Sequence, residues 1–452
     1  MSCLIADIPT INTLCRGRDW MWGARRPIAQ RNLPMKFPKI LFRSAPSSVL
    51  YLPEIDGLRS LAILAVVLFH SSGYFYVKNL ERGMYTATES AGDELIRWVL
   101  SHGFLGVQLF FAISGFVLAL PFARRARAGE SPPDYRSYIL RRVTRIEPPY
   151  VIALCFYAAA SLFLAPESFR PIQYMAGLCY ARNAFFDDGT WLFYVSWSLE
   201  IEIQFYLIAP LLSLIFRLTS PILRRGTLAV AIVAAGFYAA TYRLSGVEPM
   251  PLGGPLQHGW WLGPELAFFL IGMLVADIAS TVHSKSSDKL VSFCWDVAWV
   301  AGLLLVLSSY RMLEHSAAGI TALLVGLFLV MLGTLRSKWV RGALARPIPS
   351  MVGGACYTIY LFHPLPLAFC GKLLLPLTGN RYGWDMLLVA IPMGIAVTVS
   401  LLLLFPLVER PFMNRHWPQE LVLAIRERAL GRVIRLIRGQ DQAIANRPTA
   451  SR

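Results

Sequence analysis

The chain has 452 residues, of which 56% are hydrophobic and 15% are charged. A soluble domain carries roughly 25% charged residues, so this composition argues against a soluble protein. In a soluble protein, the formal net charge of +16 would suggest a nucleic-acid partner. The basic residues lie between the apolar blocks, however, so we attribute them to membrane topology and expect no nucleic-acid partner.

The seven cysteines show no CxxC motif and no paired spacing. They therefore predict neither a zinc site nor a disulfide framework, and we expect no bound metal and no resident cofactor.

The first fifty residues carry eight Lys or Arg and lack a secretory signal, because no apolar h-region with a cleavage site follows a basic stretch. We expect residues 1–50 to form a basic, disordered cytoplasmic tail, with the physiological start at Met1 or at Met35. Residues 51–412 form the predicted transmembrane domain, and residues 413–452 form a basic cytoplasmic C-terminal tail.

The apolar residues occur in blocks of nearly twenty, which is the length of a membrane-spanning helix. The sequence predicts an all-α polytopic membrane protein with about ten transmembrane helices, at residues 57–77, 101–122, 147–165, 193–216, 227–243, 260–281, 291–309, 317–335, 351–373 and 385–408. A weaker apolar stretch, 171–186, contains Arg182, and we interpret it as interfacial or re-entrant.

The charges between the blocks predict the orientation. The gaps at 123–146 and 336–346 are rich in arginine, whereas the gap at 78–97 is mixed and holds four carboxylates. Basic gaps alternate with neutral or acidic ones, so the positive-inside rule places both termini in the cytoplasm. No internal repeat is visible, which weakens a transporter interpretation built on paired halves.

The first predicted span carries two ionisable residues in the stretch EIDGLRSLAILAVVLFHSSGYFY, Glu54 to Tyr76. Arg59 and His70 are eleven residues apart, so on a helix they lie about 20° apart on one face and about 16 Å apart along the axis. Ionisable groups inside a membrane are costly and mark functional sites by default. The alternative is a structural histidine that bonds to a neighbouring helix.

An arginine pair follows in YILRRVTRIEPPY, Tyr138 to Tyr150. Arg142 and Arg145 share a helix face, and forked guanidinium donors match phosphate oxygens well. The alternative is a topology anchor alone. We expect Pro148 and Pro149 to occupy the first turn of the next span.

Two carboxylates open the fourth span in WLFYVSWSLEIEIQFYLIAPLL. Glu202 shares a face with Ser198 and Tyr206, whereas Glu200 lies about 200° away on the helix. A carboxylate beside an imidazole orients it and raises its basicity, so we expect Glu202 to be the partner of His70.

Three further polar residues lie in apolar surroundings. Gln108 is in the second span, and Tyr360 and His363 are in the ninth, within ACYTIYLFHPLPLAF. Pro364 and Pro366 should kink this ninth helix.

Taken in order, these motifs read DGLR with ten residues to His, GVxLFFxISGF, RRxxRIxPxY, SLExExQFY and YxxYLFHxP. This order resembles the membrane-bound acyltransferase-3 family, the bacterial O-acyltransferases that modify surface glycans and some small molecules. The resemblance covers about Tyr51 to Phe412. Two positions depart from the family pattern: Gln108 replaces a frequent Asp, and Ile203 replaces a common Glu. Many relatives add a soluble C-terminal domain, which we expect to be absent here.

The resemblance implies an acyl-CoA donor, acetyl-CoA in the simplest case, and an acceptor hydroxyl on a sugar, polysaccharide or glycosylated lipid. Arg59, Arg142 and Arg145 would hold the donor. His70 would act as general base with Glu202 as its orienting carboxylate. We place the substrate-binding residues at Gln108, Glu200, Tyr360 and His363, and the protein in the bacterial inner membrane as a multi-pass protein.

Two other functions are compatible with the residues alone. A proton-coupled polytopic transporter could use His70 and Glu202 as a proton relay, with the arginine pair as an anchor. A membrane glycosyltransferase is a weaker alternative, with Asp187 and Asp188 as its acidic site.

Overall fold

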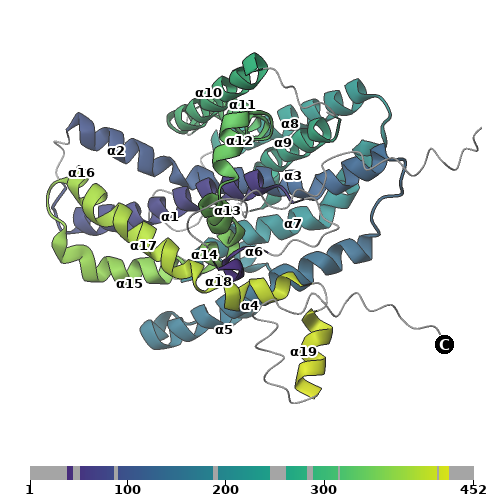
Figure 1. Ribbon diagram of the computed structural model, residues 1–452. Helices are drawn as coiled ribbons and strands as arrows, with labels where there is room; N and C mark the ends of the chain where they lie inside the picture. Colours follow the sequence, from purple (N-terminus) through teal and green to yellow (C-terminus); the bar gives the residue numbers. More distant parts are fainter. Residues whose placement is uncertain are drawn as a thin grey trace, which may run out of the picture.

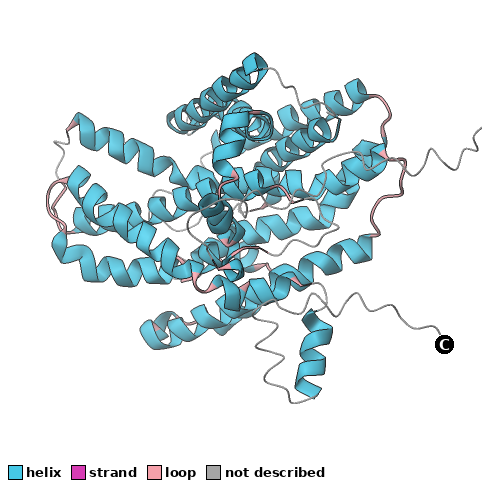
Figure 2. Ribbon diagram, viewed as in Figure 1, coloured by secondary structure: helices cyan, strands magenta, loops and turns pink. Residues whose placement is uncertain are grey.

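The computed structural model describes residues 38–43, 51–85, 90–186, 192–244, 261–281, 289–313, 316–414 and 417–426. In this part of the chain all regular structure is helical (Figure 2). The all-α prediction is therefore confirmed. Asp187 and Asp188, the acidic pair considered for a glycosyltransferase, lie outside the described residues.

Within the described ranges, nine helical segments are long and apolar enough to cross a bilayer, and a bent pair makes a tenth. The placement of both termini on the cytoplasmic side of the membrane stays a prediction. The spans are α1 (Pro53–Glu81), α2 (Ala91–Ser101) with η4 (His102–Leu105) and α3 (Gly106–Arg127), α4 (Tyr135–Leu164), η6 (Tyr194–Ser196) with α7 (Trp197–Leu212) and η7 (Ser213–Arg217), α8 (Pro221–Leu244), α9 (Leu262–Thr281), α10 (Lys289–Leu313), α11 (Ala317–Arg336), the bent pair α14 (Cys356–Phe362) and α15 (Pro364–Leu374) with η8 (Leu375–Leu377), and α16 (Tyr382–Asp385) with the π-helical η9 (Met386–Ala390), α17 (Ile391–Leu402) and α18 (Phe405–Val408).

Helix α1 runs through the middle of the bundle and contacts helices from both halves of the chain, including α3, α13 (Pro347–Gly354) and α17. Figure 1 shows α10 and α11 along one edge of the bundle and α4 and α5 (Pro171–Leu178) along the opposite edge. This central position explains why α1 carries two of the predicted functional residues.

The packing of α3 against α9 depends on two small residues. A Cβ atom on Gly115 would lie 2.1 Å from the carbonyl oxygen of Phe269, and one on Gly272 would lie 2.0 Å from that of Ala112. The two backbones therefore touch, as small residues allow in membrane helices.

Helix α4 begins twelve residues before the predicted span. Pro148 and Pro149 therefore lie inside the helix and not in its first turn, which corrects the sequence interpretation. A proline at position 148 cannot donate a hydrogen bond to the carbonyl of Thr144, four residues earlier. That carbonyl accepts a hydrogen bond from Nε1 of Trp417 instead, at 2.8 Å, so the helix continues without an unpaired group at this point.

The ninth span is broken, as Pro364 and Pro366 predict. Helices α14 and α15 meet at His363 with a bend of 57°. Because Pro364 has no N–H, the carbonyl of Tyr360 has no backbone partner from the next turn. Nδ1 of His363 fills that role and lies 2.9 Å from this oxygen.

Short elements connect and flank the spans. They are η3 (Lys39–Leu41), η5 (Pro166–Ser168), α5, α6 (Arg182–Phe185), α12 (Lys338–Leu344), α13, η10 (Arg410–Met413) and α19 (Trp417–Arg426). Two of them, η3 and α19, belong to the segments predicted as tails. The stretch 171–186 forms α5 and α6, and between them Tyr180 has a φ of 52°, a left-handed conformation that is uncommon outside glycine.

Candidate active site

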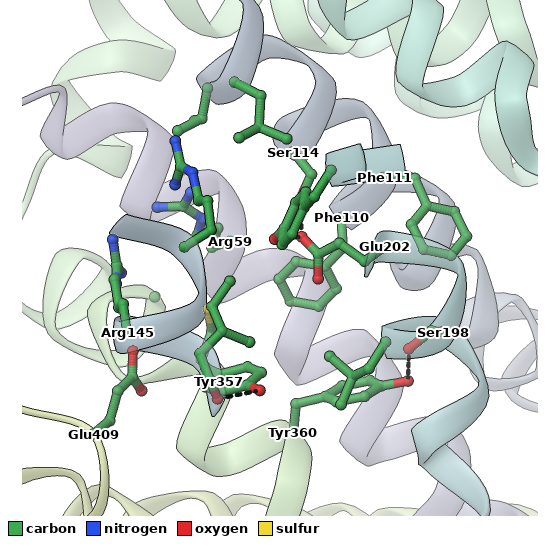
Figure 3. Close-up of a pocket in the computed structure, with 18 of the residues that line it drawn as sticks. Arg59, Phe110, Phe111, Ser114, Arg145, Ser198, Glu202, Tyr357, Tyr360 and Glu409 are labelled. Atoms are coloured by element: carbon green, nitrogen blue, oxygen red, sulfur yellow. Dashed lines mark hydrogen bonds between the residues drawn. The ribbon is translucent and has the colours of Figure 1, made fainter. Parts of the chain in front are cut away.

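One cavity gathers most of the ionisable residues that the sequence singles out. It is lined by four guanidinium groups, those of Arg43, Arg59, Arg142 and Arg145, and by two carboxylates, those of Glu202 and Glu409. Figure 3 shows Arg59 and Arg145 on one side of this cavity and Glu202 on the other. The lining is therefore cationic overall, which favours an anionic ligand.

The first pair of arginines is joined by a carboxylate of α1. Asp56 is only 2% exposed, and its Oδ1 atom accepts from Nη1 of Arg59 at 2.6 Å and from Nη1 of Arg43 at 3.3 Å. Arg59 lies one turn beyond Asp56 on the same helix, so the helix itself sets this pairing. A buried carboxylate of this kind holds the guanidinium groups in place while their other N–H groups remain available.

The second pair comes from α4. Arg142 and Arg145 both line the cavity, and Arg142 also lies over the ring of Tyr138, 5.8 Å from its centroid. The hydroxyl of Tyr357 donates to the carbonyl of Ile146 at 3.1 Å, which ties α4 to α14 at this level. The predicted helix face that carries both arginines is therefore confirmed, although α4 is longer than expected.

Glu202 lies on the opposite wall and is held by two hydroxyl groups. Ser114 of α3 and Tyr206 of α7 both donate to Oε1 of Glu202. The Tyr206 contact follows from the i+4 spacing on one helix face. Neither hydrogen bond involves His70, so the structure does not place Glu202 beside the imidazole that it was expected to orient.

Tyr360 forms part of the cavity wall and points its hydroxyl at α7. This hydroxyl lies 2.7 Å from that of Ser198 and 3.1 Å from the carbonyl oxygen of Val195 (Figure 3). The ring of Tyr360 lies edge-on to that of Phe110, at 6.2 Å between centroids. Tyr360 thus lines the cavity and also contacts His363, with 5.9 Å between the ring centroids.

His70 and His363 lie next to each other beyond this wall. Their ring centroids are 5.1 Å apart, and Nδ1 of His70 lies 3.3 Å from the hydroxyl of Tyr194. His363 is completely buried, and its Nδ1 faces two carbonyl oxygens, those of Ile359 and Tyr360. Carbonyls only accept, so Nδ1 carries a hydrogen and Nε2 of a neutral His363 is an acceptor. Within the described part of the chain, this Nε2 has no hydrogen-bond partner.

The reason that Tyr194, and not Glu202, meets His70 is the position of η6. This short helix precedes α7 and carries Tyr194 against the imidazole, with 5.2 Å between the ring centroids. Glu202 lies two turns further along and faces α3.

Two other predicted substrate residues do not line the cavity. Gln108 is buried in α3, and among the described residues its Oε1 has no partner. Glu200 is buried on another face of α7, where its Oε2 accepts from the backbone N–H of Asn183 at 3.0 Å. The expected difference between Glu200 and Glu202 is thus visible, because the two carboxylates face different neighbours.

Comparison with known protein families assigns the chain to one of them. A family model described as an acyltransferase domain, that of the acyltransferase-3 family, matches residues 52–406. The chain belongs to the acyltransferase-3 family. The resemblance read from the motifs is confirmed, and the protein is a membrane-bound acyltransferase by family.

Relatives of this acyltransferase include bacterial O-acetyltransferases. The O-acetyltransferase OatA of Staphylococcus aureus (strain NCTC 8325 / PS 47) is 21% identical over 334 residues, which cover 69% of this chain and 50% of OatA. The peptidoglycan O-acetyltransferase OatA of Listeria monocytogenes is 27% identical over 178 residues, 37% of this chain and 25% of that protein. A Staphylococcus aureus (strain COL) protein with the provisional name O-acetyltransferase SACOL0978 is 22% identical over 342 residues, 71% of this chain and 51% of the relative.

The acyltransferase thus spans about half the length of these Staphylococcus relatives. No solved structure gives a significant match.

Several cavity residues of this acyltransferase escaped the sequence analysis. Arg43 precedes the first span and looks like part of a basic tail, and Cys356 looks like a small apolar residue. Ser114 is a small residue of the kind that serves close helix packing. Glu409 lies in the stretch VERPF at the end of the last apolar block, and its Oε2 accepts from both the backbone N–H and the hydroxyl of Thr358. An acidic residue at the end of an apolar block was the available signal for Glu409.

Proposed function

We propose that this protein transfers an acyl group, acetyl in the simplest case, from acyl-CoA to a hydroxyl of a sugar, polysaccharide or glycosylated lipid at the membrane. The observation that carries the proposal is the convergence of four guanidinium groups on one cavity, which Tyr360 also lines. The ring centroid of His363 lies 5.9 Å from that of Tyr360 and 5.1 Å from that of His70. The relatives named as O-acetyltransferases support acetyl as the group.

Arg59, Arg142 and Arg145 bind the phosphates of the donor. Coenzyme A carries a diphosphate and a 3′-phosphate, and forked guanidinium donors form two parallel hydrogen bonds to such groups. The orientation predicted from the charges would place the end of the bundle that holds these three arginines at the cytoplasmic surface, where acyl-CoA is made.

Glu202 belongs to the donor cavity in this proposal and not to an acid–base pair with His70. A carboxylate would repel the phosphates, but it lies on the wall opposite Arg145 (Figure 3). The pantetheine arm of coenzyme A carries amide N–H groups, which can donate hydrogen bonds to a carboxylate. Glu202 therefore orients the arm that leads to the thioester.

His70 acts as general base on the acceptor hydroxyl. Its imidazole removes the hydroxyl proton while the oxygen attacks the thioester carbonyl carbon, the C–S bond breaks and the ester C–O bond forms. The imidazolium then returns the proton to the departing coenzyme A thiolate, so no other proton donor is needed. In this proposal Tyr360, which also lines the donor cavity, His363, Gln108 and Glu200 contribute to acceptor binding.

A thioester-consumption assay tests this proposal. Purified protein in nanodiscs should release free coenzyme A thiol from acetyl-CoA when a glycan acceptor is present, and a His70→Ala variant should not. Proton-coupled transport without any thioester consumption would instead favour the transporter, in which the arginine pair serves only as an anchor.

A further inference from the structure

A fourth arginine in the cavity comes from outside the predicted transmembrane domain. Arg43 precedes α1 by ten residues, yet its side chain lines the same cavity as Arg59, Arg142 and Arg145. Its side chain is 18% exposed, similar to the 15% of Arg59. It is therefore a partly buried cation and not a fully solvated residue of a tail.

Two apolar neighbours fix the position of Arg43. Leu41 and Phe42 are partly buried and pack against the core, and η3 packs against α18. On the other side, a Cβ on Gly354 would lie 3.4 Å from the Cβ of Arg43, which is ordinary contact. The backbone thus holds this side chain at the rim of the cavity.

Among the described residues, the recorded bonding of Arg43 uses few of its donors. Its one ion pair within this part of the chain is with Oδ1 of Asp56, at 3.3 Å, and this oxygen also accepts the shorter contact from Arg59. A guanidinium has five N–H donors, so a second anion can bind without loss of the ion pair. The cavity is lined by four guanidinium groups and by the carboxylates of Glu202 and Glu409, and the arginines share one further carboxylate, Asp56, so positive charge remains in excess.

The two ends of α1 set the direction in which a donor can lie. One end of the proposed donor site is formed by Asp56, Arg59 and Arg43. His70 lies about 16 Å from Arg59 along the axis of α1. In coenzyme A, the thioester and the adenosine 3′-phosphate are at opposite ends of the molecule. With the thioester at His70, the 3′-phosphate is left at the rim, and a phosphate monoester is the most highly charged group of the donor.

We infer that Arg43 binds the 3′-phosphate of the acyl-CoA donor, so that the segment before α1 completes the donor site. This inference rests on the proposed function, because it takes acyl-CoA as the donor. It assigns a specificity role: Arg43 distinguishes coenzyme A from analogues that lack the 3′-phosphate.

The test compares two ligands on the full-length protein in nanodiscs. Equilibrium dialysis would measure the binding of coenzyme A and of 3′-dephospho-coenzyme A to the native protein and to Arg43→Ala. We expect Arg43→Ala to weaken coenzyme A binding about ten- to a hundredfold, the range for a lost charge-assisted hydrogen bond, and to change binding of the dephospho analogue less than about twofold. Arg43→Lys keeps the charge and should retain part of the discrimination.

Arg136 supplies a matched control. It is exposed at the start of α4 and does not line the cavity, so Arg136→Ala should bind both ligands as the native protein does. An equal loss of both ligands in Arg43→Ala would show that Arg43 only supports Asp56, and unchanged affinities would show that it does not touch the donor; either result overturns the inference. Native protein that binds neither ligand would overturn the proposed function itself.

Discussion

Replacement of Gly353 by alanine should disrupt both the fold and the donor cavity. Gly353 is the penultimate residue of α13, which packs against α1, and it lines the cavity. A Cβ on Gly353 would lie 1.6 Å from the carbonyl oxygen of Asp56 and 2.5 Å from its carbon. Both atoms belong to backbone, so no flexible side chain can move to relieve the overlap.

The size of the effect follows from the distance that must be recovered. Ordinary van der Waals contact begins at 3.4 Å, whereas the added Cβ would lie 1.6 Å from the carbonyl oxygen of Asp56. Helices α1 and α13 must therefore move apart by nearly the difference between these two distances. Overpacking of this kind typically costs about 1–3 kcal/mol, and we expect about 3 kcal/mol because rigid backbone is displaced. The same movement shifts Asp56 and with it the hydrogen bond to Arg59, so coenzyme A affinity should fall about tenfold.

Gly342→Ala is the matched control, because Gly342 is an exposed helical glycine with no atom within 4 Å of its added Cβ. Thermal unfolding of both variants in detergent, together with coenzyme A binding, gives the comparison. We expect the midpoint of Gly353→Ala to fall by roughly 5 °C or more while Gly342→Ala stays near the native value. Equal midpoints and unchanged affinity would refute the packing of α1 against α13.

Three further sets of substitutions test the site. Arg142→Ala and Arg145→Ala should each raise the KM for acyl-CoA about ten- to a hundredfold with little change in kcat, and Lys should restore only part of the loss; full activity in the double Ala variant would reduce the pair to a topology signal. His70→Gln should abolish transfer but leave coenzyme A binding intact, because Gln keeps a polar group and cannot take a proton; substantial activity would contradict the general-base role. Glu202→Gln should lower kcat/KM for acyl-CoA about ten- to a hundredfold, since it weakens a charge-assisted acceptor in the cavity, whereas Glu200→Gln should cost far less; equal losses would remove Glu202 from the donor site.

The spans were predictable from the sequence because a membrane imposes length and hydropathy on each helix. The ten predicted blocks correspond to the nine helical spans and the bent pair, and the kink at Pro364 follows from the missing N–H of proline. The start of α4 was not predictable in this way, since the arginine-rich turns before Pro148 are polar and hydropathy does not register them.

The partners of the site residues were harder to predict. The helical repeat correctly separates Glu202 from Glu200, because that requires only the geometry of one helix. It cannot say which neighbouring helix a face will meet, and so it could not show that Tyr194 would meet His70 while Ser114 meets Glu202. A prediction of where Arg43 lies needs the same kind of information, because its place in the cavity comes from the packing of Leu41 and Phe42.

The most direct test of the account is mass spectrometry of surface glycans from a strain in which this protein is deleted and then restored. We expect the deletion to remove acyl esters from one glycan or glycolipid and the native protein to restore them. His70→Gln, expressed in the membrane at the same level, should not restore them. A glycan ester content that is unaffected by the deletion, or restored equally well by His70→Gln, would contradict the proposed acyl transfer.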